Sequence, residues 1–214
     1  MSEKKRSQRG RPANQALSQT IIDAAYELFD KLGFHTATME KVAQRAKISK
    51  ITIYRHFKSK EALFDAVIAA RCERFNMQTL FEGLQGSAEE QLMAVGSSLL
   101  HTLLSPDVRS VEAMIVADKT NQKTLSKLHY DAGPTHVLAQ IETLLLQLHT
   151  KALLNVPNPL QSARMFAALF KGSDLLMIAR FDEARATDDH EIEPYCRSAV
   201  KMFIAAHGGN DKTG

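Results

Sequence analysis

Cysteine is scarce in this chain of 214 residues, and the two that occur, Cys72 and Cys196, are far apart and outside any CxxC or Cys/His spacing. A disulfide framework is therefore not expected, and we predict a reducing, cytoplasmic compartment. Charged residues interrupt every apolar run well before the roughly 18 residues that a membrane span needs. The basic N-terminus has no apolar stretch of the kind that follows in an export signal. We expect no membrane partner.

Glycine and proline are also few, at 10 and 6 residues, which favours long ordered elements. Helical apolar spacing recurs between the places where turn-forming or polar residues gather, and no stretch requires period-two alternation. The predicted fold class is all-α. The expected breaks lie at residues 83–87, 105–106, 133–134, 155–159 and 182–191.

Signatures of catalysis are missing from the sequence. There is no GxSxG motif, no phosphate-binding loop and no Glu-x-x-His pair. The eight histidines are scattered, without metal-ligand spacing. We therefore predict no catalytic residues, no metal and no cofactor, and an enzyme is disfavoured.

Charge is distributed unevenly along the chain. Residues 1–60 hold 13 Lys and Arg against 5 Asp and Glu, whereas residues 61–214 hold 14 against 19. Such asymmetry indicates a polyanion-binding module joined to a part with another task. A solvated basic tail would explain residues 4–11 only.

The basic region contains the pattern of a helix-turn-helix. Thr38 is a candidate N-cap for a short helix, and Ser49 for a second one that begins at Lys50. In the second helix Ile53 and Phe57, four residues apart, form the predicted buried side. A strand would instead bury Arg55 together with two isoleucines. Ile51, Thr52, Tyr54 and Arg55 then point outward, as in a helix that enters a major groove.

The stretch "IIDAAYELFDKLGFHTATMEKVAQRAKISKITIYRHFKSKEALF" resembles the DNA-binding domain of the TetR family of bacterial transcriptional regulators. The resemblance implies an all-α homodimer with an N-terminal three-helix DNA-binding domain and a helical C-terminal domain for ligand binding and dimerisation. We expect a disordered basic arm at 1–16, a DNA-binding domain at 17–62, a sensing and dimerisation domain at 63–208 and a disordered tail at 209–214. By position, the resemblance assigns operator contacts to Thr38, Thr52, Tyr54, His56 and Lys60, and sequence reading to the variable Lys50, Ile51 and Arg55.

One residue departs from the family pattern. The family commonly has glycine in the turn between the two short helices, and this chain has Lys47. If the position is left-handed, lysine costs about 1 kcal/mol relative to glycine.

The basic arm ahead of the first helix contains "RGRP", with Arg9 and Arg11. This motif resembles the core of an AT-hook, in which arginine enters the narrow minor groove of A·T-rich DNA. A merely basic tail that adds non-specific affinity is the alternative.

The last two long apolar runs suggest a dimer interface. They are apolar around much of the helix circumference, so a second chain, or alternatively an internal layer of helices, must cover them. The candidate interface residues are Phe170, Leu175, Ile178, Tyr195, Ala199 and Phe203.

A small-molecule effector is the remaining expected partner, besides double-stranded DNA and a second copy of the chain. Apolar and polar side chains of the middle helices are candidates for its cavity, although each could equally be ordinary core. The candidates are Met77, His101, Met114, His129, Tyr130, Phe166 and Phe170.

The sequence therefore predicts a homodimeric transcriptional regulator, a repressor that binds a pseudo-palindromic operator and is released by a largely hydrophobic effector. The alternative is an architectural protein that binds DNA without sequence preference and without an effector.

Overall fold

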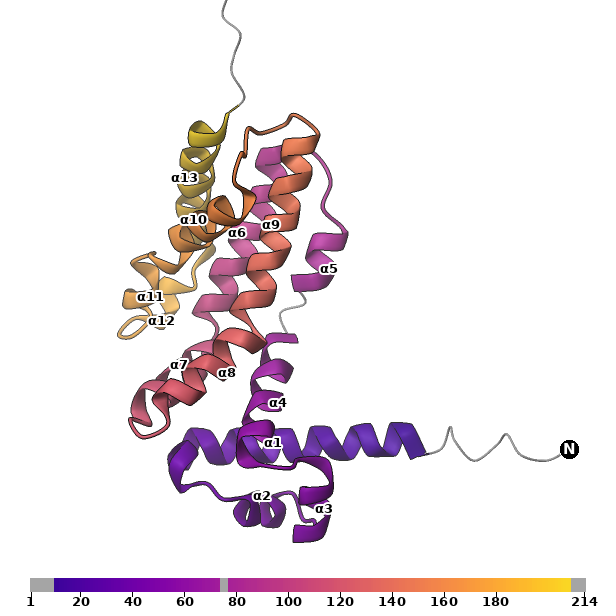
Figure 1. Ribbon diagram of the computed structural model, residues 1–214. Coiled ribbons are helices and arrows are strands. Elements are labelled where there is room, and N and C mark those ends of the chain that lie inside the picture. The colour runs from indigo at the N-terminus through magenta and orange to yellow at the C-terminus, as the bar shows by residue number, and fades with distance from the viewer. Residues whose placement is uncertain (1–9, 74–76, 209–214) are drawn as a thin grey trace, which may run out of the picture. The chain divides into compact units, whose positions relative to one another are not determined.

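The computed structural model describes residues 10–73 and 77–208, and every regular element in these two ranges is a helix. The all-α prediction is confirmed. The helices form two compact units (Figure 1), one of Met1–Arg71 with Ser110–Ala132 and one of Cys72–Arg109 with Gly133–Gly214. Among the described helices, none combines the length and the apolar character that crossing a membrane requires.

The first unit holds the N-terminal helices and part of a later helical pair. Its core is built around the rings of Phe29, Phe34 and Phe64, whose centroids are 5.2 to 5.7 Å apart. All three rings are fully buried, so they fix the first helix against the fourth. The elements of this unit are α1 (Gly10–Thr36), α2 (Met39–Arg45), α3 (Lys50–His56), most of α4 (Lys60–Glu73), the second half of α7 (Pro106–Ala117) and α8 (Gln122–Ala132).

Helix α1 begins earlier than the sequence suggested. The expected disordered arm extended to residue 16, but the helix includes Gly10, Arg11 and Pro12. Proline is tolerated in a first helical turn, where its missing N–H has no partner to lose, so the motif does not prevent the helix from starting here. Residues 1–9, with Arg9, and the expected tail at 209–214 lie outside the described residues.

Apolar residues at helical spacing over residues 18–33, followed by Gly33, predict a helix that stops there, and the structure confirms a break at Gly33. Gly33 has a φ of 74° and interrupts the helical geometry of α1. A side chain at this φ would clash with the backbone, which explains the glycine.

Part of the C-terminal region packs with the DNA-binding helices. Ser110 donates a hydrogen bond to the Asp30 carboxylate of α1. The buried Asp118 accepts hydrogen bonds from the N–H and side-chain amide of Asn121, and one from the backbone of His35. The expected boundary near residue 62 placed residues 110–132 in the sensing domain, because helical periodicity does not show such long-range contacts.

The second unit is a bundle of longer helices. Its core is continuous across the bundle, and α9 packs on α10 while α6 packs on α13. Its elements are α5 (Met77–Glu82), α6 (Ala88–Leu104), the start of α7, α9 (Pro134–Thr150), α10 (Pro159–Lys171), α11 (Leu175–Ile178), α12 (Glu183–Ala186) and α13 (Asp189–His207).

The residues expected at the dimer interface lie in this core. The apolar segment of residues 160–181 does not form one helix, because α10 ends at Lys171 and α11 is a single turn. Other helices of the same unit therefore cover the apolar side that we had expected a second chain to cover. Tyr195 is half-buried and donates to the Leu169 carbonyl. The other five are at most 9% exposed within the chain, which leaves little of their surface to a partner: Phe170, Leu175, Ile178, Ala199 and Phe203.

Candidate nucleic-acid interface

Side-chain caps define the two short helices α2 and α3. The Thr38 hydroxyl accepts a hydrogen bond from the Lys41 N–H at 3.3 Å and caps α2. The Ser49 hydroxyl accepts from the Thr52 N–H at 3.1 Å, and the Ser49 and Thr52 hydroxyls are 2.8 Å apart. Both N-caps predicted from the sequence are confirmed, and each satisfies a backbone donor that the helix leaves unpaired.

The turn between these helices passes through a left-handed residue. Lys47 has a φ of 56°, in the region where a β-carbon is strained. The conditional prediction about this position therefore applies, and the exposed lysine destabilises the turn relative to glycine.

Helix α3 separates its buried and exposed residues as the helical register predicted. Ile53 is fully buried, whereas Ile51 is 81% exposed and Tyr54 is 41% exposed. Arg55 is exposed as well. Phe57 was predicted to share the buried side of the helix. It is instead the C-cap of α3, with an extended backbone and a half-buried side chain, so the helix ends at His56. The side of α3 opposite Ile53 carries an apolar, an aromatic and a cationic side chain at the surface.

Two polar contacts hold α2 and α3 against α1. The Nδ1 atom of His56 lies 3.0 Å from the Ser18 hydroxyl. Arg45 of α2 donates from Nε to the Glu27 carboxylate at 2.8 Å. Sequence reasoning missed Ser18 and Glu27 because nothing in the local pattern relates residues 18 and 56, or 27 and 45.

The ammonium group of Lys60 is occupied within the protein. It donates to the carbonyl oxygens of Phe34 at 2.7 Å, His35 at 3.3 Å and Ala37 at 3.0 Å, and it lies 4.3 Å from the centre of the Phe34 ring. An ammonium has three donors, and here each one has an acceptor. Lys60 thus connects the start of α4 to the segment after Gly33, which the resemblance did not suggest.

Lys50, at the first position of α3, is bonded to Glu40 of α2. Its Nζ lies 2.5 Å from the Glu40 Oε1 atom and 5.8 Å from the centre of the Tyr54 ring. The hydrogen bond from Lys50, then the backbone N–H of Glu40 itself, hold the pKa of the Glu40 carboxyl below its usual range. The same hydrogen bond raises the pKa of Lys50. Both groups are therefore charged at neutral pH.

The residues proposed for an effector cavity belong to both units. In the first unit Met114 is buried, His129 half-buried and Tyr130 exposed. In the second unit His101 is exposed, with Nε2 3.5 Å from Asp189. The Met77 side chain lies outside the described part of the chain.

Phe166 and Phe170, from the same set, fill the core of the second unit. The Phe166 ring lies 5.0 Å from both Phe170 and Phe203. A β-carbon added at Gly96 would lie 2.3 Å from the Phe170 ring, so Gly96 allows α6 to approach α10 closely. These rings pack against protein rather than open space.

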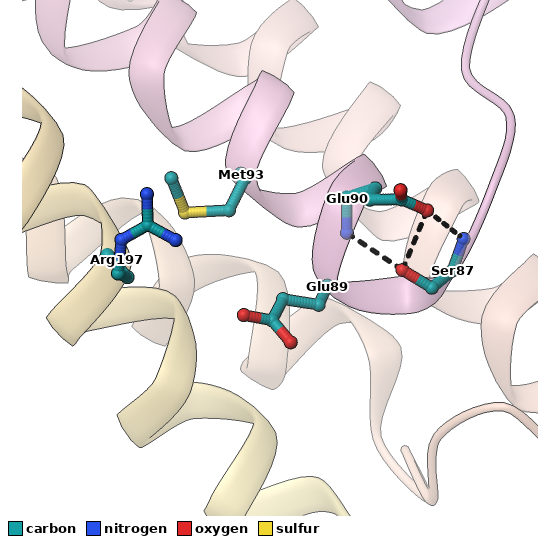
Figure 2. A pocket seen from close by; sticks show the side chains of 5 residues that line it. All are labelled: Ser87, Glu89, Glu90, Met93 and Arg197. Carbon is teal, nitrogen blue, oxygen red and sulfur yellow. Dashed lines mark hydrogen bonds between the residues drawn. The ribbon is translucent and has the colours of Figure 1, made fainter.

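A shallow hollow of about 480 Å³ lies between the start of α6 and the middle of α13 (Figure 2). It is lined by Ser87, Glu89, Glu90, Met93 and Arg197. Ser87 and Glu90 form a capping box there, and the Ser87 N–H, followed by its hydroxyl, lowers the pKa of Glu90. Four of the five lining residues are polar or charged, and none of the five is among the residues that the sequence predicts for an effector cavity.

Two family models match the chain. Residues 21–67 match the bacterial regulatory proteins of the tetR family, and residues 90–209 match the C-terminal domain of AefR-like transcriptional repressors. The second match alone covers more than half of the chain. This chain belongs to the TetR family. TetR-family regulators are DNA-binding transcription factors rather than enzymes.

Individual relatives are similar to this TetR-family chain over different lengths. The uncharacterised HTH-type transcriptional regulator YdeS of Bacillus subtilis is 30% identical over 118 residues, which is 55% of this chain and 57% of YdeS. A second relative from the same organism, YvkB, is 32% identical over 44% of this chain and 46% of its own. The chain thus spans about half the length of these curated relatives.

Solved structures match over nearly the whole fold. The flavonoid-responsive regulator FrrA superposes with a TM-score of 0.74 and 27% identity, covering 90% of this chain and 97% of FrrA. A TetR-family regulator from Mesorhizobium loti superposes with a TM-score of 0.73 and 24% identity, covering 91% and 98%.

Proposed function

We propose that the protein is a homodimeric, effector-responsive repressor that places α3 of each subunit in the major groove of a pseudo-palindromic operator. The orientation of α3 carries this proposal. Ile53 is fully buried while Ile51, Tyr54 and Arg55 stand at the surface on the other side, on a helix capped by Ser49. A major groove is wide enough to admit such a helix.

The exposed side chains suit different parts of the duplex. Arg55 and Lys50 are the residues we propose to donate to guanine edges, and Ile51 suits a thymine methyl group. Tyr54, Thr38 and His56 suit phosphate oxygens, which fix the register of the protein on DNA. Thr52 lies beside the Ser49 cap and is placed to contribute its methyl group or hydroxyl. We also propose Arg9 and Arg11 for contacts with phosphate or the minor groove; Arg9 and the side chain of Arg11 lie outside the described part of the chain.

Lys60 has a structural role in this proposal rather than a DNA contact. Its three donors are satisfied by backbone carbonyl groups of the first unit. We therefore propose that it positions α4 rather than contacting phosphate.

For the dimer we propose a surface different from the residues suggested by the sequence. Met165 on α10 is 57% exposed and Met202 on α13 is 58% exposed. Nearby in sequence, Met177 and Phe181 are 66% and 77% exposed. Large apolar side chains at the surface of two adjacent long helices favour burial by a second copy.

We propose a hydrophobic effector, and an aromatic one first. The supporting observation is the similarity to FrrA, which is named as flavonoid-responsive and matches over 90% of this chain. The effector would favour a dimer whose two α3 helices no longer match the operator spacing. A screen of flavonoids and other hydrophobic small molecules for release of the protein from DNA tests this part of the proposal.

Operator selection from random DNA tests the central proposal. We expect one recurring inverted repeat. Recovery of DNA without a shared motif would favour the architectural alternative. In titrations on the selected site, Tyr54→Ala should weaken operator and random DNA by a similar factor, whereas Arg55→Ala should also relax the preference for one base. Equal losses on both DNAs for both variants would contradict the division of roles.

A further inference from the structure

Glu40 is an acidic residue in a basic DNA-binding surface, and neither the sequence pattern nor the proposed contacts assign it a role. It occupies the second position of α2, and its carboxylate meets the first residue of α3 across the turn. Both side chains of the Glu40–Lys50 pair are exposed, at 50% and 65%.

Three groups converge on the carboxylate. Lys50 bonds to Oε1, the backbone N–H of Glu40 bonds to its own side chain, and the Thr38 hydroxyl also lies within hydrogen-bonding reach. Thr38 and Lys50 are the two residues that we place on phosphate and base. Glu40 therefore lies between them and orients one of them directly.

A carboxylate at this place weakens binding to DNA in general. Phosphate groups repel it, and it neutralises a lysine that could otherwise release counterions. A carboxylate is favourable at only one kind of base edge, that of cytosine, because it accepts a hydrogen bond from the cytosine N4 amino group. A carboxylate accepts about four hydrogen bonds, so its present partners leave capacity for a base.

We propose, as a step that rests on the proposed function, that Glu40 is a specificity-determining residue. It holds the Lys50 ammonium toward the O6 and N7 atoms of a guanine and accepts from the N4 group of a cytosine. Each half-site then contains a G·C pair read by the Glu40–Lys50 pair, next to a thymine whose methyl group contacts Ile51.

The test is operator selection and titration with the full-length wild type and Glu40→Gln. Glutamine pairs with adenine rather than cytosine, so the variant should change the preferred base at one position in each half-site. Its preference for the wild-type operator over random DNA should fall about tenfold. Its affinity for random DNA should rise, since each subunit loses one negative charge.

Glu27→Gln is the matched control. It also removes a carboxylate bonded to a basic residue of α2, in this case Arg45, but from α1. We expect it to leave the base preference at every operator position unchanged. Lys50→Met serves as a second test and should relax the preference at the same base pair as Glu40→Gln. In the double variant the two effects should not add.

The outcomes separate this inference from the proposed function. If the wild type selects no inverted repeat, the regulator proposal fails. If it selects one, but Glu40→Gln keeps every base preference and shifts operator and random DNA by the same factor, Glu40 only repels phosphate and the inference is wrong.

Discussion

Helices α3 and α13 are held in place by different means. Helix α3 has seven residues, of which Ile53 alone is buried, and relies on the Ser49 cap and on contacts with neighbouring helices. Helix α13 has 19 residues, five of them buried in a continuous core. Isolated helices shorter than about 12 residues are marginal in water, so α3 depends on its few fixed points. This arrangement leaves most of its surface available to DNA.

The largest expected effect is in the bundle core. Phe170→Ala should lower the free energy of unfolding by about 3–5 kcal/mol, because it removes a fully buried ring and leaves a cavity beside Gly96. Denaturant unfolding measures this change. Leu146→Ala is the control, since that side chain of α9 is 51% exposed and its loss should change stability little. Similar values for both variants would show that Phe170 does not lie in a packed core.

Ile53 and Ile51 allow a buried and an exposed residue of the same helix, α3, to be compared. Ile53→Ala should destabilise the protein by about 2–4 kcal/mol, since Ile53 is fully buried. Ile51→Ala should leave the free energy of unfolding almost unchanged but reduce discrimination at one base of the operator. Thermal unfolding and DNA titration of both variants separate the two roles. A stability loss from Ile51→Ala comparable to that from Ile53→Ala would contradict the register of α3.

Asp118 tests the part of the first unit contributed by residues 110–132. Asp118→Ala should cost about 1–2 kcal/mol, because it removes the acceptor for Asn121 and for the His35 backbone. Burial acts to raise the pKa of Asp118, but these hydrogen bonds outweigh it, and the folded-state pKa lies below the usual value.

A lowered folded-state pKa fixes the sign of the pH dependence of Asp118. The stabilisation is complete above the ordinary aspartate pKa and is lost as the pH falls through the folded-state value. The difference in stability between wild type and Asp118→Ala should therefore be constant near neutral pH and shrink in acid. A difference that grows in acid would contradict the hydrogen-bonded carboxylate.

The smallest expected effect is a gain. Lys47→Gly should raise the free energy of unfolding by about 0.5–1 kcal/mol, because glycine removes the strain at a φ of 56° but adds freedom to the unfolded chain. Lys58→Gly is the control, as an exposed lysine outside the residues with positive φ. Chemical denaturation should show a gain only for the first variant.

The front of the chain could be predicted in more detail than the rest. Caps at Thr38 and Ser49, the stop at Gly33 and the orientation of Ile51 and Ile53 follow from local rules of helix geometry. The roles of Lys60 and Glu40 could not be predicted, since their partners lie 10 to 26 residues away in sequence. Local spacing does not report such contacts.

In the C-terminal part of the chain, composition alone is insufficient to predict which apolar residues are buried in the core. The sequence of residues 160–181 shows that this segment is apolar, but not which of its sides faces the chain's own core. The helix ends at Lys171, and this break allows α11 and α12 to pack with neighbouring helices of the same unit. Phe170 and Phe203 are consequently internal, while Met165 and Met202 are exposed.

Guanine-N7 methylation protection on the selected operator tests most directly whether α3 enters the major groove. The wild type should protect guanines in two major-groove segments on one side of the duplex, a whole number of helical turns, of about 10 base pairs each, apart. Arg55→Ala should lose part of that protection in both segments. Full occupancy of the operator with no protected guanine N7 would contradict the assignment of α3 as the reading helix.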